Sequence, residues 1–161
     1  MATCRLVSTH ADRTKLVPAV AELESLLWPH PWGAPSLSST LEQPGALLLV
    51  AEAPDGRLLS YCLIQQVLDE ATVLQVGTAR AAQRQGLART LLNVAIEHLR
   101  AASCQTLWLE VRAGNAAAIG LYLTLGFVRE AVRKRYYPPL GPEKQEEDAV
   151  VMRCSIGTAA T

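Results

Sequence analysis

A short polar loop between an apolar strand and an amphipathic helix constrains this chain more than any other feature. The loop reads Gln83-Arg84-Gln85-Gly86-Leu87-Ala88, and apolar residues then recur with helical spacing at positions 87, 91, 92, 95, 96 and 99. A helix that begins here exposes unpaired backbone N–H groups and the positive end of its dipole. The small residues Gly86 and Ala88 let an anion approach those groups closely. The junction therefore predicts a pyrophosphate-binding loop.

The alternative is an ordinary helix start with two solvated arginines, Arg84 and Arg89. Two familiar phosphate-binding motifs do not occur, because the sequence contains neither G-x-x-x-x-G-K-[ST] nor G-x-G-x-x-G. The choice between the two interpretations depends on the segments that follow the loop.

Composition sets limits on the class of protein. With 161 residues, half of them hydrophobic, the chain is long enough for one well-packed domain, which we expect over residues 1–156 with a disordered tail over 157–161. A formal net charge of zero argues against non-specific nucleic-acid binding. We see no apolar run of transmembrane length and no signal peptide. The four cysteines and three histidines form no metal-binding pattern, and reduced thiols indicate a cytoplasmic protein.

The order of apolar patterns predicts a mixed α/β fold. We expect strands near residues 5–7, 46–52, 58–68, 72–78, 106–111, 128–136 and 148–154, and helices near 12–27, 36–43, 86–102 and 115–125. Ser36 is a candidate cap for the second helix, Pro18 marks a kink or a late start in the first, and Gly126 is a candidate stop for the last. The order places antiparallel hairpins at both ends and helical crossovers between the middle strands.

A lone carboxylate, Glu110, interrupts the apolar strand at residues 106–111. Strand alternation places it on the same face as Trp108, and burial beside that ring would raise the pKa of the Glu110 carboxyl toward neutrality, as a general base requires. The alternative is a glutamate at the solvated end of a strand. On the helix that follows, the simplest interpretation of Tyr122 is a core aromatic residue, and that of Asn115 is an N-cap.

Together these segments resemble the GCN5-related N-acetyltransferases (GNAT). Residues 83–88 fit the Q/R-x-x-G-x-G/A loop that binds acetyl-CoA in that family, with Ala88 at the second glycine. The run 107–119 (LWLEVRAGNAAAI) is similar to the RimI group, which acetylates the N-terminal alanine of a ribosomal small-subunit protein, and Leu121-Tyr122, Leu125-Gly126-Phe127, Arg135-Tyr136-Tyr137-Pro138 and Asp148-Ala149 continue the likeness. The resemblance covers roughly residues 60–155, whereas Arg80-Ala81-Ala82 departs from the family's Pro-Asp-Tyr-like lead into the loop.

The resemblance implies the GNAT fold, a mostly antiparallel mixed sheet that splays between its two middle strands and is flanked by about four helices. It also implies roles for particular residues. Glu110 would take a proton from the acceptor and Tyr122 would protonate the departing thiolate. Acetyl-CoA would be held by the backbone of Val76, Gly77 and Thr78, by the pyrophosphate loop with Arg84, Gln85, Gly86, Leu87, Ala88 and Arg89, and by Asn115 near the thiol. Glu110 and Tyr122 would face one cleft.

The same resemblance implies the partners: acetyl-CoA and the N-terminal segment of an acceptor protein, expected to be ribosomal, with no metal, membrane or direct nucleic-acid contact and with the enzyme acting as a monomer. Two alternatives stay open, namely a different acceptor such as a lysine side chain or a small amine, and a non-catalytic regulator that binds acyl-CoA.

Two charged segments allow either of two interpretations. The acidic run Glu143, Glu146, Glu147 and Asp148 is a solvated loop or a clamp for a basic acceptor. The basic run Arg129, Arg133, Lys134 and Arg135 is an exposed strand face or a contact for the cofactor's 3′-phosphate or for the ribosome.

Overall fold

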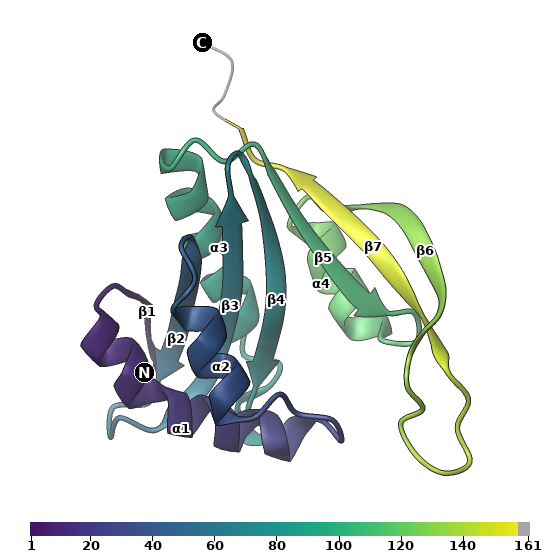
Figure 1. The fold of residues 1–161 in the computed structure, drawn as a ribbon, viewed down its shortest axis with the longest axis horizontal. Helices are drawn as coiled ribbons and strands as arrows, with labels where there is room; N and C mark the ends of the chain where they lie inside the picture. Colours follow the sequence, from purple (N-terminus) through teal and green to yellow (C-terminus); the bar gives the residue numbers. More distant parts are fainter. Residues whose placement is uncertain (158–161) are drawn as a thin grey trace.

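The computed structural model describes residues 1–157, so the expected tail lies outside it apart from Gly157 (Figure 1). The elements run in the order β1 (Thr3–Val7), α1 (His10–Leu27), α2 (Ala34–Leu41), β2 (Ala46–Glu52), β3 (Leu58–Val67), β4 (Glu70–Thr78), η1 (Arg80–Ala82), α3 (Leu87–Ala101), β5 (Thr106–Arg112), α4 (Ala116–Thr124), β6 (Val128–Tyr137) and β7 (Glu147–Ser155). No helix within residues 1–157 is both long and apolar enough to cross a membrane.

A single twisted sheet of seven strands organises the fold, in the order β1-β2-β3-β4-β5-β7-β6. Every neighbouring pair is antiparallel except β4 and β5, which are parallel and are connected through α3. The expected mixed fold is confirmed, including hairpins at β2–β3 and β6–β7 and the helical crossover in the middle of the chain.

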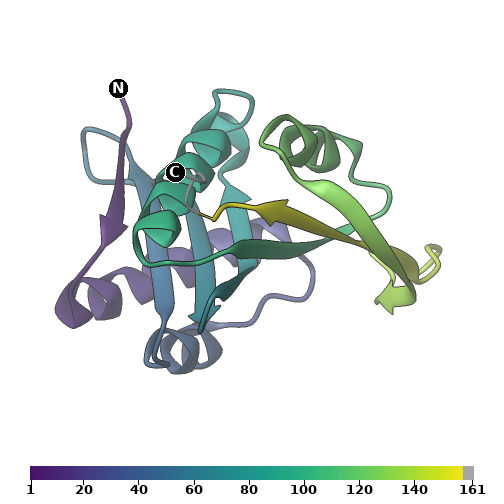
Figure 2. The ribbon, with the colours of Figure 1, turned by 90° about the horizontal axis from the view of Figure 1, so that it is seen from above.

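Helices cover both faces of the sheet and give it two cores. Helices α3 and α4 lie on one face, and α1 and α2 lie on the other (Figures 1 and 2). The α3 side chains that bury there are the ones the sequence periodicity selects, namely Leu91, Leu92, Ala95, Ile96 and Leu99. The second core packs α1 and α2 against β2 and β3. Burial of these two apolar surfaces is the main stabilising term.

The two middle strands separate soon after they meet. Strands β4 and β5 pair only over Glu70–Thr72 and Thr106–Trp108. Beyond this point the β3–β4 register shifts between Leu63 and Ile64, which leaves Leu74 as an extra residue in β4. Because a bulge bends its strand, β4 turns away from β5, and the gap between them widens along the sheet (Figure 1). The splay expected from the family resemblance is confirmed.

Two local predictions need correction, and one short element was missed. Helix α2 begins at Ala34 after Gly33, with Pro35 in its first turn, so Ser36 lies inside the helix and does not cap it. Helix α1 is capped by Thr9, and Pro18 lies within it, so Pro18 does not mark a late start. The short helix η1, which leads into the loop at residues 83–88, was not predicted because three residues give no periodic signal.

A fully buried carboxylate fixes the connection between α1 and α2. Glu24 Oε1 accepts a hydrogen bond from the Gly33 N–H at 2.6 Å, and Oε2 accepts from the Trp32 N–H and from Gln75 Nε2, both at 3.2 Å. The Tyr61 hydroxyl donates to Gln75 Oε1 at 2.6 Å. Since Gln75 lies on β4, this network ties the α1–α2 connection to the strand that bends.

We predict that Glu24→Gln lowers the free energy of unfolding by about 1–3 kcal/mol, because the new amide group faces donors and leaves one of them unsatisfied. Glu22→Gln, an exposed site on the same helix, should leave it unchanged. Urea denaturation followed by circular dichroism measures both variants, and equal stabilities would contradict the anchoring role of Glu24.

Candidate active site

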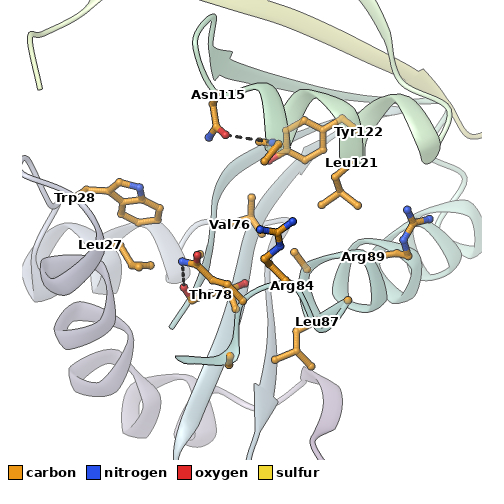
Figure 3. A pocket seen from close by; sticks show the side chains of 17 residues that line it. Leu27, Trp28, Val76, Thr78, Arg84, Leu87, Arg89, Asn115, Leu121 and Tyr122 are labelled. Carbon is orange, nitrogen blue, oxygen red and sulfur yellow. Dashed lines mark hydrogen bonds between the residues drawn. The ribbon is translucent and has the colours of Figure 1, made fainter. Parts of the chain in front are cut away.

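A cleft of about 540 Å³ opens where β4 leaves β5 (Figure 3). Its lining comes from the ends of α1 and β4, from the loop before α3, and from one face of α4: Leu27, Trp28, Val76, Gly77, Thr78, Ala82, Gln83, Arg84, Gly86, Leu87, Ala88, Arg89, Asn115, Ala117, Ala118, Leu121 and Tyr122. The cleft brings together every predicted cofactor-binding residue except Gln85. Its volume lies in the range that suits a small-molecule ligand.

The loop before α3 presents its backbone amides to this cleft. Gly86 adopts a left-handed conformation (φ +79°) as the N-cap, and the backbone bond from Thr90 N–H to Gly86 O opens the helix. The preceding amides of the first turn, at residues 87–89, therefore have no acceptor within the helix. Arg84, also at positive φ (66°), directs its guanidinium group into the cleft (Figure 3). This arrangement of amides and positive charge suits a phosphate group.

Arg89 connects the two helices that border the cleft. Its Nη2 donates to Thr124 Oγ1 at 2.7 Å, which joins α3 to the end of α4 across the cleft. On the other side, Gln83 Nε2 donates to the Thr78 carbonyl at 3.0 Å and fixes the loop to the end of β4.

The free edge of β4 forms the floor of the cleft. Ala79 N–H bonds to Leu59 O of β3, and Ser60 Oγ donates to Gly77 O. Since peptide groups alternate along a strand, Gly77 directs its backbone toward β3, whereas Val76 and Thr78 direct theirs toward the gap that β5 has left. The backbone groups of Val76 and Thr78 are therefore better placed to meet a ligand than those of Gly77, although Gly77 also lines the cleft, and cofactor binding by all three residues stays a prediction.

Gly77 is needed for its size. A Cβ atom there would lie 2.9 Å from Leu27 Cδ1, 2.9 Å from a ring carbon of Trp28 and 3.1 Å from Tyr61. The end of α1 thus packs directly on β4 and lines the cleft, a contact that sequence reasoning missed. No local pattern could reveal it, because α1 and β4 are about fifty residues apart in the chain and meet only in the tertiary structure.

Helix α4 supplies the opposite wall. Asn115 is its N-cap, as predicted, and its Oδ1 accepts from the Ala118 N–H at 3.2 Å. Tyr122 is largely buried against Phe127, with ring centroids 5.7 Å apart, and it also lines the cleft. Burial raises the pKa of Tyr122 above its ordinary value of 10.0, so the hydroxyl stays protonated and can donate.

Glu110 lies outside this cleft. Leu109 and Val111 point into the core under α3 and α4, so strand alternation directs Glu110 to the other face of β5. The expectation that Glu110 and Tyr122 face one cleft is wrong, because β5 lies between them. The bend of β4 leaves β5 without a neighbour on its β4 side at this level, while β7 still pairs with its other edge, and both faces of β5 therefore border the same gap.

The surroundings of Glu110 also differ from the expected apolar burial. Its carboxylate is 25% exposed and forms an ion pair with Arg133, Nε to Oε1 at 3.1 Å. Tyr137 lies near it, where burial first and the negative charge of Glu110 second raise the pKa of Tyr137 to about 12. The immediate neighbours of Glu110 are therefore a cation and a phenol.

Part of each charged run is engaged within the protein. Glu147 and Asp148 belong to β7: Glu147 bonds to Arg112 and to the Gly114 N–H, while Asp148 accepts from the Arg135 N–H and contacts Lys134. The Arg135 N–H contributes most to a lowered pKa of Asp148. The acidic run is thus neither a wholly solvated loop nor a free clamp. None of the four basic residues at 129 and 133–135 lines the cleft.

Comparison with known proteins identifies the class. The model of the acetyltransferase (GNAT) family matches residues 17–127. A curated relative from Escherichia coli K12, [ribosomal protein bS18]-alanine N-acetyltransferase, is 38% identical over 140 residues, covering 87% of this chain and 91% of the relative. The chain therefore belongs to the acetyltransferase (GNAT) family, as the sequence predicts.

Two solved structures have the same fold as this chain. The crystal structure of the ribosomal-protein-S18-alanine N-acetyltransferase from Escherichia coli superposes with a TM-score of 0.86 at 35% identity, covering 99% of this chain and 97% of that one. The NatC complex bound to Gag peptide and CoA shares the fold, with a TM-score of 0.79 at 16% identity over 94% of this chain and 98% of the other.

Two glycines allow a test of the phosphate-binding loop. Gly86 and Gly56 have similar positive φ (+79° and +88°), and a Cβ atom added to either would meet no other atom within 4 Å. We predict that Gly86→Ala and Gly56→Ala each cost about 1–2 kcal/mol of stability, but that only Gly86→Ala weakens CoA binding in calorimetric titration. Equal affinities for CoA in the two variants would contradict a role for the loop.

Proposed function

We propose that this protein transfers the acetyl group of acetyl-CoA to the N-terminal amine of a protein, with the N-terminal alanine of a ribosomal small-subunit protein as the preferred acceptor. The observation that carries the proposal is the cleft at the β4–β5 gap, where free amides of α3, the guanidinium group of Arg84 and an open strand edge converge. We infer the acceptor from the curated relative, which is named as an alanine N-acetyltransferase of ribosomal protein bS18.

The cleft fits acetyl-CoA in three places. The amides at residues 87–89 and Arg84 suit the pyrophosphate, while Val76 and Thr78 offer strand-like hydrogen bonds to the amides of the pantetheine arm. Asn115 lies at the far end of the same cleft, where it would orient the thioester. The NatC complex, which has the same fold, was solved with CoA bound.

The chemistry requires proton transfer at two groups. Glu110 would first accept a proton from the acceptor ammonium group, directly or through water, and release it to solvent, and the neutral amine then attacks the acetyl carbon. As the carbon–sulfur bond breaks, Tyr122 would donate its proton to the departing thiolate, and the second proton that the nitrogen loses would restore the Tyr122 hydroxyl, directly or through water. An α-amino group has a pKa of about 7.7–8.0, so a carboxylate can assist its deprotonation near neutral pH.

The placement of Glu110 and Tyr122 on opposite sides of β5 supports approach of the two substrates from opposite faces of the sheet. Acetyl-CoA would occupy the cleft on the α3 and α4 side with Tyr122. The acceptor amine would enter from the other face, past Glu110, Arg133 and Tyr137, and meet the thioester in the gap between β4 and β5.

We also propose that the protein is cytoplasmic and monomeric, and that residues 1–156 form a single domain.

A peptide assay tests the activity. Thiol release should be faster with a peptide that begins with alanine than with an N-terminally blocked lysine peptide or a polyamine. We predict that Glu110→Gln lowers kcat by about 10²- to 10⁴-fold, because the acceptor then loses its base. Glu130→Gln, which removes an acid paired with Arg153 on the same sheet, should retain wild-type kcat. Coenzyme A binding without transfer to any amine would instead identify a non-catalytic regulator.

The pKa of Tyr122 gives a second prediction. Because that pKa lies above 10.0, the hydroxyl remains protonated at alkaline pH, and the single-turnover rate should not fall through ionisation of Tyr122 below about pH 10. Tyr122→Phe should lower the rate by about 10²-fold or more while still binding CoA, since the ring is retained. A Tyr122→Phe variant as fast as the wild-type protein would exclude the role.

A further inference from the structure

The carboxylate of Glu147 lies where three segments of the chain meet. Its Oε2 accepts a hydrogen bond from the Gly114 N–H at 2.6 Å, and its Oε1 contacts Arg112 Nη1 at 3.2 Å. Glu147 is the first residue of β7, and Gly114 lies in the turn between β5 and α4. These contacts therefore join the C-terminal hairpin to the turn that leads into the cleft wall.

Arg112 holds the other end of the same hairpin loop. Its Nη1 also donates to the Pro138 carbonyl at 3.2 Å, and its guanidinium group lies over the Tyr137 ring, 4.5 Å from the centroid. Pro138 directly follows β6, so Arg112 and Glu147 together hold both ends of the loop 138–146 against β5. Charge-assisted contacts of this kind are stronger than neutral hydrogen bonds.

Glu147 supplies the hydrogen-bond acceptor for the central amide of this turn, the Gly114 N–H. Ala113 N–H bonds to Asp148 O and Asn115 N–H bonds to Arg112 O, both at 2.9 Å, so backbone groups satisfy the flanking positions. Within the described residues, Glu147 is the only side chain that bonds to the Gly114 N–H. A Cβ atom at residue 114 would lie 2.7 Å from Glu147 Oε2, so a larger residue there would displace the Glu147 carboxylate.

We propose that Glu147 and Arg112 act as a positioning pair, which couples the hairpin loop 138–146 to Asn115 and hence to α4. Asn115 follows Gly114 directly, caps α4 and lines the cleft, and α4 carries Tyr122. The inference rests on the proposed function, because its consequence is for acetyl transfer. It replaces the direct clamp for a basic acceptor that the acidic run suggested, since contacts within the protein already occupy both oxygens of Glu147.

The test compares Glu147→Gln, Arg112→Gln and the double variant with Glu146→Gln, an exposed neighbour, as the matched control. Calorimetric titration with CoA counts the binding sites in each preparation, and kcat is expressed per site. We expect each single variant to lose about 10- to 100-fold in kcat per site, because misplacing the catalytic groups slows the reaction. The double variant should lose no more than the worse single variant, since both break one pair.

A merely structural role would lower the melting temperature and the number of CoA-binding sites but leave kcat per site at the wild-type value, and that result would overturn the proposal. Losses that multiply in the double variant would overturn it too, as would an equal loss in Glu146→Gln.

Amide hydrogen exchange at Gly114 keeps the test independent of the proposed function. If the wild-type protein transfers no acetyl group to any amine, the proposed function fails. Hydrogen exchange at the Gly114 amide then still tests whether Glu147 and Arg112 hold this turn. Faster exchange at Gly114 in Glu147→Gln and Arg112→Gln than in the wild-type protein and Glu146→Gln supports the positioning pair. Equal exchange in all four proteins overturns it.

Discussion

The separation of β4 from β5 creates the cleft and opens a passage between the two faces of the sheet. A parallel pair that stayed together would satisfy the backbone of Val76 and Thr78 and fill the space beneath α3 and α4. Instead the pairing ends after Thr72 and Trp108, and the bulge at Leu74 turns β4 aside. Strand edges carry unpaired donors and acceptors, so this one is a ready partner for an extended ligand. Without the bend, neither the phosphate-binding loop nor Tyr122 would border an open site.

Positive groups gather at one end of the gap, and the two residues proposed to transfer protons, Glu110 and Tyr122, lie elsewhere along it. Gly86 takes the left-handed conformation that begins α3, the first-turn residues of that helix line the cleft, and the guanidinium group of Arg84 points into it. Tyr122 and Glu110 lie on opposite sides of β5, the first buried and protonated, the second paired with Arg133. In the proposed reaction this division would let the two substrates approach from opposite faces of the sheet.

Buried or half-buried carboxylates hold the segments that border the gap. Glu24 ties the α1–α2 connection to β4 through Gln75, and Glu147 ties the C-terminal hairpin to the turn before α4. Each accepts a backbone N–H that would otherwise lack a partner among residues 1–157, which makes removal of the carboxylate costly. Irregular segments at a cleft lack the repeated hydrogen bonds of helices and strands, so hydrogen bonds from single side chains largely determine their conformation.

Local patterns along the chain were enough to predict the elements and the chemistry of the loop. Period-3.6 apolar spacing defined the buried face of α3, and Asn115 and Gly126 marked the ends of α4. The motif at residues 83–88 indicated the GNAT family, to which the chain belongs, and acetyl-CoA binding by this loop stays a prediction. Neighbouring residues specify such features without help from the rest of the fold. Four features came from the packed structure alone. Leu27 and Trp28 line the cleft, and Gly77 leaves room for them because it has no side chain. Glu110 forms an ion pair with Arg133, and the Glu147 carboxylate accepts a hydrogen bond from the Gly114 N–H. These contacts join residues far apart in the chain, and because many partners of suitable charge or shape exist, the twist and packing of the sheet select among them.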